Sequence, residues 1–316
     1  MTRRLDDAGT MLGGRNGLHG AAVRIAREDG SCLPDEAWAS EPPTPYEERK
    51  VVDMRWEDLT IANFEDAVSD AGGVCILPIG VIEAHGPHLP LSTDALIAHR
   101  VACAAAEIEP ALVFPFYPWG VNVDSKAFPG GIVLKRRLIL ELLEDVCSEI
   151  SRNGCKKIIL LSGHGGNRFM LPLFVQTQLD QGIDYVPYLV CGDVLGRDGF
   201  FTTLFEDGNS GHAGECETSL MMHLAPEATH PEWIPEEPGR ENARVGHLVG
   251  RLYTPAEWRG RFPNHYAGEA RGASEEKGKL WLEHRATALA KIIKTVKDDQ
   301  TAQDVYREYD AGIYRA

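Results

Sequence analysis

The sequence lacks several features that would assign it to a specialised class of protein. It has no apolar run approaching the roughly 20 residues that a membrane-spanning helix needs. Its 32 basic residues are outnumbered by 47 acidic ones, a formal charge of −15, which argues against nucleic acid or anionic membranes as main partners. Its seven cysteines include no CxxC pair, so we expect a reducing compartment and no disulfide framework. With no secretory signal pattern, we expect a cytoplasmic protein.

The remaining composition is that of an ordinary globular chain. Its 316 residues, 43% of them hydrophobic, are enough to bury one large core. Residues 1–45 are rich in Gly, Pro, Asp and Glu, and we predict that they form a flexible N-terminal extension. No convincing linker divides the rest of the chain, so we predict a single domain over residues 46–316.

Apolar runs and helical spacing alternate along that domain. The apolar runs predict strands over residues 74–79, 111–116, 157–162 and 185–191. The helical pattern predicts helices over residues 94–107, 138–150 and 167–181, and a last long one from Ser274. This alternation indicates an α/β fold, a three-layer α/β/α sandwich with a mostly parallel sheet. Residues 226–271, rich in Pro, Gly and charge, form either a long excursion or an oligomer contact.

Polar side chains gather directly after the first predicted strand. Glu83 and His85 stand two residues apart, so in an extended chain both can point to one place, and Asp94 can return from the following loop. Carboxylates and an imidazole at a strand's carboxyl end suit zinc or manganese. The alternative is a solvated turn with incidental polar residues. We interpret the stretch as a metal site. Because Asp94 as a metal ligand cannot also cap the next helix, we expect Thr93 to be its N-cap.

Two later segments carry similar groups. His164 follows the third strand in a glycine-rich turn, where a phosphate-binding loop is the rival interpretation, but the lysine and the spacing of such loops are missing. His212 and Glu217 stand at the start of another helix. Carboxylates there can simply complement the helix dipole. The position of His164, at the same edge of the sheet as the first cluster, favours a role as a metal ligand.

These three motifs, in this order, resemble those of the creatininase (creatinine amidohydrolase) family. The resemblance extends from about residue 50 to 297 and includes Phe128-Pro-Gly130 and Ser274-Glu-Glu-Lys-Gly278. It implies a creatininase-like α/β/α fold, a small-molecule amide substrate whose non-peptide C–N bond is hydrolysed, and a homohexamer. It also implies two divalent metal ions, with zinc as the first choice and manganese or iron as alternatives.

The resemblance further implies roles for individual residues. Glu83, Asp94 and His164 would hold one metal, and His85 the other, with Asp94 bridging. Creatininase takes a further glutamate two residues after the histidine of the third strand, where this chain has Gly166, so Glu217 is the remaining candidate ligand. The implied catalytic residues are His212 and Glu217, and the implied substrate contacts are Asn122, Gly165 and His212. His212 would protonate the leaving nitrogen or stabilise the oxyanion.

The chain also departs from the family pattern. It has residues Asn122-Val-Asp-Ser125 where the family often has Ser-x-Glu-His, and its segment 207–211 lacks the aromatic lid of creatininase. Both differences favour a substrate other than creatinine. The alternatives are a creatininase-like peptidase that trims a modified precursor peptide, and a catalytically silent scaffold. The complete ligand set disfavours the scaffold, which has no physical need for it.

Overall fold

The computed structural model describes residues 53–191, 195, 199–206 and 211–312. The predicted flexible extension over residues 1–45 lies outside the described residues, and the single domain over residues 46–316 stays a prediction. Residues Val51–Ala316 form one compact unit. Among the described helices, none combines the length and the apolar character needed to cross a membrane.

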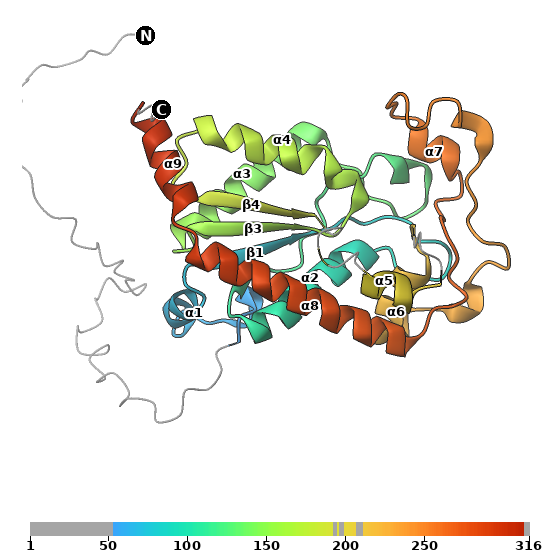
Figure 1. Cartoon of the computed structure of the whole chain (residues 1–316), viewed down its shortest axis with the longest axis horizontal. Helices are drawn as coiled ribbons and strands as arrows, with labels where there is room; N and C mark the ends of the chain where they lie inside the picture. The colour runs from blue at the N-terminus through green and yellow to red at the C-terminus, as the bar shows by residue number, and fades with distance from the viewer. Residues whose placement is uncertain (1–52, 192–194, 196–198, 207–210, 313–316) are drawn as a thin grey trace, which may run out of the picture. The chain divides into compact units, whose positions relative to one another are not determined.

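A parallel sheet of four strands, in the order β2-β1-β3-β4, lies at the centre of the fold (Figure 1). The strands are β1 (Val74–Ile79), β2 (Leu112–Val113), β3 (Lys157–Ser162) and β4 (Val186–Cys191). The predicted ranges of β1 and β3 are correct to the residue. β2 is shorter than the predicted 111–116, since only Leu112 and Val113 pair with β1.

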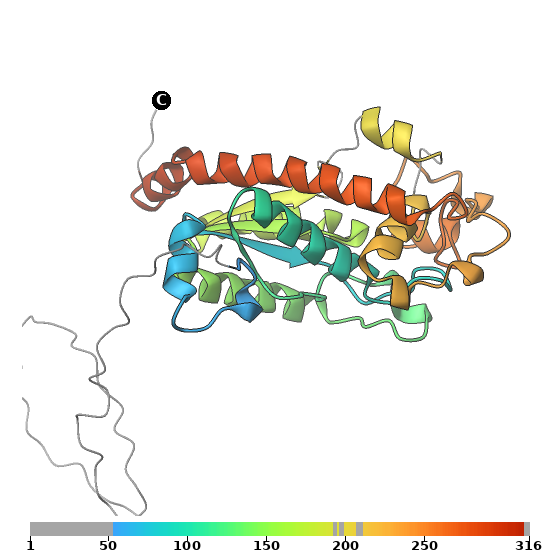
Figure 2. The ribbon, with the colours of Figure 1, turned by 90° about the horizontal axis from the view of Figure 1, so that it is seen from below.

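Helices cover both faces of the sheet. Ile76 and Ile159 face a core formed with α2, α6 and α8, whereas Leu77 and Leu160 face a second core formed with α1, α3 and α4. Figure 2 shows α8 and α3 on opposite sides of the sheet. The three-layer α/β/α sandwich is therefore confirmed. The helices named here are α1 (Phe64–Asp70), α2 (Thr93–Ile108), α3 (Arg136–Arg152), α4 (Met170–Thr177), α6 (Glu215–Leu224) and α8 (Glu275–Asp298).

The remaining helical elements are short or peripheral. They are η2 (Trp56–Asp58), η3 (Asp124–Ala127), η4 (Gly165–Arg168), η5 (Gln178–Asp180), α5 (Gly199–Leu204), η7 (Pro226–Ala228), η8 (Pro231–Trp233), η9 (Ala243–Val245), α7 (Glu257–Arg261) and α9 (Thr301–Asp310). The helix predicted over residues 167–181 is thus divided among η4, α4 and η5.

The two predicted helix starts have different outcomes. Ser274 caps α8, because its Oγ accepts a hydrogen bond from Lys277 N at 3.2 Å. The prediction that Thr93 caps α2 is wrong. The Thr93 hydroxyl instead donates to Pro90 O at 2.6 Å, so it fastens the preceding loop and leaves the helix without a side-chain cap.

The segment over residues 226–271 extends past the carboxyl ends of the strands, where α7 lies (Figure 1). It is joined to the loop before α6 by two backbone hydrogen bonds of 2.9 Å between His212 and Ala267. These bonds hold the excursion beside the carboxyl edge of the sheet, where parallel sheets usually bind their ligands.

Lys157, at the start of β3, holds the end of α8. Its buried Nζ donates to three backbone carbonyls, those of Val296 at 2.9 Å, Lys297 at 2.7 Å and Asp299 at 2.6 Å. Because such carbonyls have no partner within the helix, we expect Lys157→Met to lower the free energy of unfolding by about 3 kcal/mol. Urea denaturation measures this loss, and Lys156→Met, at a neighbouring exposed ion pair, is the control. Equal stability of the two variants would contradict the role given to Lys157.

Candidate metal centre

The end of β1 and the start of α2 meet because of one glycine. A side chain at Gly80 would come within 2.3 Å of the Ala95 backbone, so only glycine lets the helix begin directly against the strand. Asp94, in the first turn of α2, is thereby placed beside the loop that carries Glu83 and His85. All three side chains are almost fully buried.

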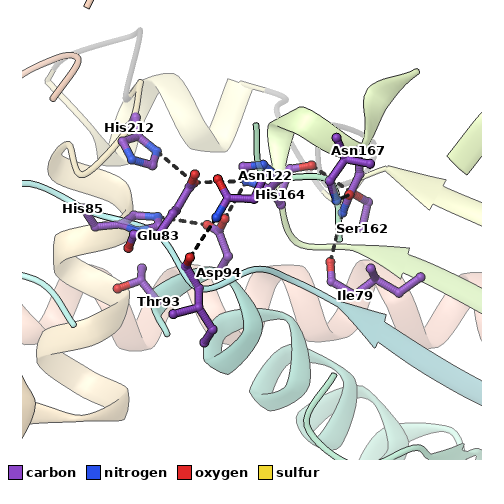
Figure 3. Close-up of polar contacts among 12 residues, drawn as sticks. Ile79, Glu83, His85, Thr93, Asp94, Asn122, Ser162, His164, Asn167 and His212 are labelled. Carbon is purple, nitrogen blue, oxygen red and sulfur yellow. Dashed lines mark hydrogen bonds and ion pairs between the residues drawn. The ribbon is translucent and has the colours of Figure 1, made fainter. Parts of the chain in front are cut away.

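The Asp94 carboxylate lies between two imidazoles (Figure 3). Its Oδ1 is 3.0 Å from His85 Nε2, and its Oδ2 is 2.6 Å from His164 Nδ1. His164 enters from the turn between β3 and η4, and its Nδ1 is also 3.1 Å from Glu83 Oε1. The carboxyl ends of β1 and β3, together with α2, therefore bring four of the predicted ligands together.

Glu217 approaches the same place from the first turn of α6. Its Oε2 accepts a hydrogen bond of 2.7 Å from Ala213 N and lies 3.8 Å from His85 Nε2. Three sets of side chains have ligand atoms within 4.8 Å of one another: Glu83, Asp94 and His164; His85, Asp94 and Glu217; and Glu83, His85 and His212. Asp94 belongs to the first two sets, which is the position of a bridging ligand. That these residues bind metal stays a prediction.

The donor groups fit divalent cations. Glu83 Oε1 and Asp94 Oδ2 are buried and accept no hydrogen bond of normal geometry, although His164 lies close to both. Buried carboxylate oxygens in this condition are costly unless a cation or a proton satisfies them. Three carboxylates and two imidazoles form a suitable ligand set for zinc, manganese or iron.

Without a cation, protons occupy the centre. Burial disfavours the charged form of His85, but the carboxylates of Asp94 and Glu217 outweigh it and raise the pKa of His85 to about 10. Burial also disfavours the charged form of His164, but the carboxylates of Glu83 and Asp94 outweigh this effect and raise the pKa of His164 well above its usual value. Burial raises the pKa of Glu217 to about 7. A cation must therefore displace protons in order to bind.

We expect metal uptake near pH 7 to release about two protons, so that affinity rises with pH. Because the pKa of His85 is raised above its usual 6.5, the ion pairs of His85 stabilise the metal-free folded protein fully below pH 6.5. That contribution is lost as the pH rises toward 10. Titration calorimetry in buffers of different ionisation enthalpy counts the protons. Uptake with no proton release would contradict the protonated, metal-free state.

The glycines after His164 have distinct consequences. A side chain at Gly166 would lie 2.4 Å from His164 Nε2 and 2.8 Å from Val121 O, so no glutamate can stand there without moving this imidazole. Gly165 meets no such obstacle and lines a cavity of about 270 Å³. Asp94, His164 and Glu217 also line this cavity, which therefore opens onto the candidate metal centre.

His212 has a defined tautomer. Its Nε2 is 2.7 Å from the carbonyl oxygen of Ala84, which can only accept, so Nε2 carries the proton. The lone pair is then on Nδ1, 3.8 Å from Glu83 Oε1. Burial, with the neighbouring His85, lowers the pKa of His212 to about 3, so the ring is neutral. Nδ1 is then the only nitrogen of the ring with a lone pair open to a proton or a hydrogen-bond donor.

Asn122 lies beside the same cluster (Figure 3). Its Nδ2 donates to the carbonyl oxygen of Ile82 at 2.7 Å, which ties the Asn122 side chain to the loop that carries Glu83. Its buried Oδ1 has no hydrogen-bond partner among the described residues. The predicted substrate contacts Asn122, Gly165 and His212 thus all border the candidate metal centre, and their contact with substrate stays a prediction.

Sequence reasoning missed two residues of the 226–271 segment. His265 Nε2 is 3.3 Å from Glu83 Oε2, and the Trp258 ring centroid is 5.8 Å from that of His212. Neither residue belongs to a motif or a periodic pattern, so nothing in the sequence indicated them. Segment 207–211 has no aromatic residue, but Trp258 supplies one beside His212 from α7.

The fold and the cluster together define an α/β protein with a carboxylate–imidazole centre at the carboxyl edge of its sheet. Residues 57–293 match the family model Creatininase, described as creatinine amidohydrolase. The chain belongs to the creatininase family, which confirms the resemblance seen in its motifs, and it is an enzyme of the amidohydrolase kind.

Individual relatives agree with this assignment. The creatinine amidohydrolase of Pseudomonas putida is 27% identical over 253 residues, which cover 75% of this chain and 95% of that protein. The mycofactocin precursor peptide peptidase of Mycolicibacterium smegmatis is 30% identical over 158 residues, 48% of this chain and 58% of that protein. A crystal structure of creatinine amidohydrolase (creatininase) superposes with a TM-score of 0.65 at 25% identity, covering 79% of this chain and 100% of that one.

Proposed function

We propose that this protein hydrolyses a C–N amide bond of a small molecule, a cyclic amide, lactam or formamide, with two divalent metal ions. Zinc is the first choice, and manganese or iron are the alternatives. The observation that carries the proposal is the Asp94 carboxylate, which lies 3.0 Å from His85 and 2.6 Å from His164 and belongs to two candidate ligand sets. A single carboxylate in this position can bridge two cations.

Each residue then has a definite task. Glu83, Asp94 and His164 would hold one cation, and His85, Asp94 and Glu217 the other. When bound, such a pair of cations lowers the pKa of a shared water and offsets the negative charge that develops on the substrate oxygen. His212, neutral and with its lone pair on Nδ1, accepts a proton from the attacking water and returns it to the leaving nitrogen. Asn122 and Gly165 border the substrate.

The surroundings of the centre support a small substrate other than creatinine. The cavity of about 270 Å³ is slightly smaller than the usual range for small-molecule sites. Trp258, the aromatic residue beside His212, comes from α7 and not from segment 207–211, where creatininase has its aromatic lid. Arg168 and Arg285 also line the cavity, and amides that carry a carboxylate therefore belong among the first compounds to be assayed.

A peptidase is the second candidate. The observation that favours it is the 30% identity to a precursor peptide peptidase over 48% of this chain. A peptide whose C-terminus is to be trimmed needs an open groove rather than an enclosed cavity. Peptides and small amides must therefore be assayed side by side.

Metal analysis of freshly purified protein, followed by assays of the zinc- and manganese-loaded forms, tests the proposal. We expect about two metal equivalents per chain and turnover of a lactam, a formamide or another small amide. Cleavage of C-terminal peptides alone would support the peptidase. Less than half an equivalent of metal, with no recovery after metal addition, would indicate a silent scaffold.

Two further predictions are carried over from the sequence. We propose a cytoplasmic location and a homohexamer, and the family resemblance supports the hexamer. Light scattering coupled to gel filtration measures the assembly mass. With 34.8 kDa per chain, a monomeric or dimeric mass would contradict the hexamer.

A further inference from the structure

We propose that His265 is a positioning residue of the metal centre: it holds the Glu83 carboxylate so that one of its oxygens stays directed at the cation site. The inference rests on the proposed function, because it takes Glu83 to be a metal ligand. His265 belongs to the segment after α7, 182 residues from Glu83, and no motif predicted its presence at the site.

The two oxygens of Glu83 face different partners. Oε1 lies 3.1 Å from His164 Nδ1, on the side of the candidate ligand set that includes Asp94. Oε2 lies 3.3 Å from His265 Nε2. Because a carboxylate only accepts, His265 donates its Nε2–H to Oε2, and this contact opposes rotation of the carboxylate away from the cation site.

The backbone of His265 is strained. Its φ is +56°, in the left-handed region, and among the non-glycine residues within the described part of the chain only Ala213 shares a positive φ. This conformation is unfavourable for a residue with a Cβ, whereas glycine adopts it freely. A histidine at such a position indicates that its side chain performs a task that offsets this cost.

Neighbouring rings fix the imidazole. The His265 ring centroid is 4.7 Å from that of His212, at an interplanar angle of 82°, and 4.8 Å from that of Phe128. The Trp258 ring is 6.2 Å away and also nearly perpendicular. His265 is 1% exposed, so its ring has no room to turn out of the site. The same ring thus contacts both the candidate ligand Glu83 and the candidate proton acceptor His212.

A hydrogen bond to a ligating carboxylate typically changes metal affinity by about 10- to 100-fold. His265→Gly removes the imidazole and also relieves the backbone strain, so a loss of affinity in this variant cannot come from backbone strain. His265→Gln keeps an amide donor near the position of Nε2. His247→Gly, at an exposed histidine of the same segment, is the matched control.

The experiment is a competition between each folded, metal-free variant and a chromogenic chelator for zinc. We expect His265→Gly to bind zinc about 10- to 100-fold more weakly than the wild type, and His265→Gln to recover most of that loss. His247→Gly should match the wild type. Wild-type affinity in His265→Gly, or an equal loss in the Gly and Gln variants, would overturn the positioning role alone. A wild-type protein that binds no zinc would overturn both this role and the proposed function.

Discussion

Asp94→Asn is expected to yield a folded protein that retains neither cation and has no measurable turnover. The substitution keeps the shape of the side chain but removes the charge shared by two of the three candidate ligand sets. It also removes the carboxylate that raises the pKa of His85, so the imidazole loses its main ionic partner. Because both sets lose their common member, we expect the two metals to be lost together.

Metal analysis after dialysis, together with the assay on the substrate found in the panel, measures this effect. Asp145→Asn, at an exposed acidic position of α3, controls for the loss of one negative charge. A variant that keeps one full equivalent of metal would show that Asp94 serves one cation only. Retained turnover would refute its assignment altogether.

His212→Ala is expected to have the second largest effect, and on turnover alone. The imidazole is neutral, donates from Nε2 to the Ala84 carbonyl and presents Nδ1 as a proton acceptor. Removing a general acid/base of this kind lowers kcat by roughly 10²–10⁴-fold. The ligand sets that contain Asp94 do not include His212, so the metal content should stay at the wild-type level.

The measurement is a parallel determination of kcat and metal content, with His247→Ala as the control for loss of an imidazole. The structure also offers the set Glu83, His85 and His212, in which His212 would itself be a ligand. Loss of one metal equivalent in His212→Ala would favour that set, and the division of tasks proposed here would be wrong.

The sequence predicted those parts of the fold that depend on local patterns. β1 and β3 are continuous apolar runs with polar residues at their ends, and their bounds were predicted correctly. The N-cap of α2 was not, because the Thr93 hydroxyl bonds to Pro90 O instead of to the helix. Which acceptor a hydroxyl chooses depends on the path of the neighbouring loop, and no local pattern states it.

The same limit applies to the site. Glu83, His85, Asp94 and His164 could be grouped from the sequence because parallel strands end at one edge of a sheet. His265 could not, since its contribution depends on a left-handed backbone and on the return of a long irregular segment to Glu83. Neither property leaves a period or a motif in the sequence. Trp258 was missed for the same reason.

The most direct test of the two-cation centre is anomalous diffraction from crystals soaked in zinc or manganese, recorded at the absorption edge of that metal. We expect two neighbouring peaks, one among Glu83, Asp94 and His164 and the other among His85, Asp94 and Glu217. A single peak, or peaks that leave Asp94 uncoordinated, would contradict a centre built around this carboxylate.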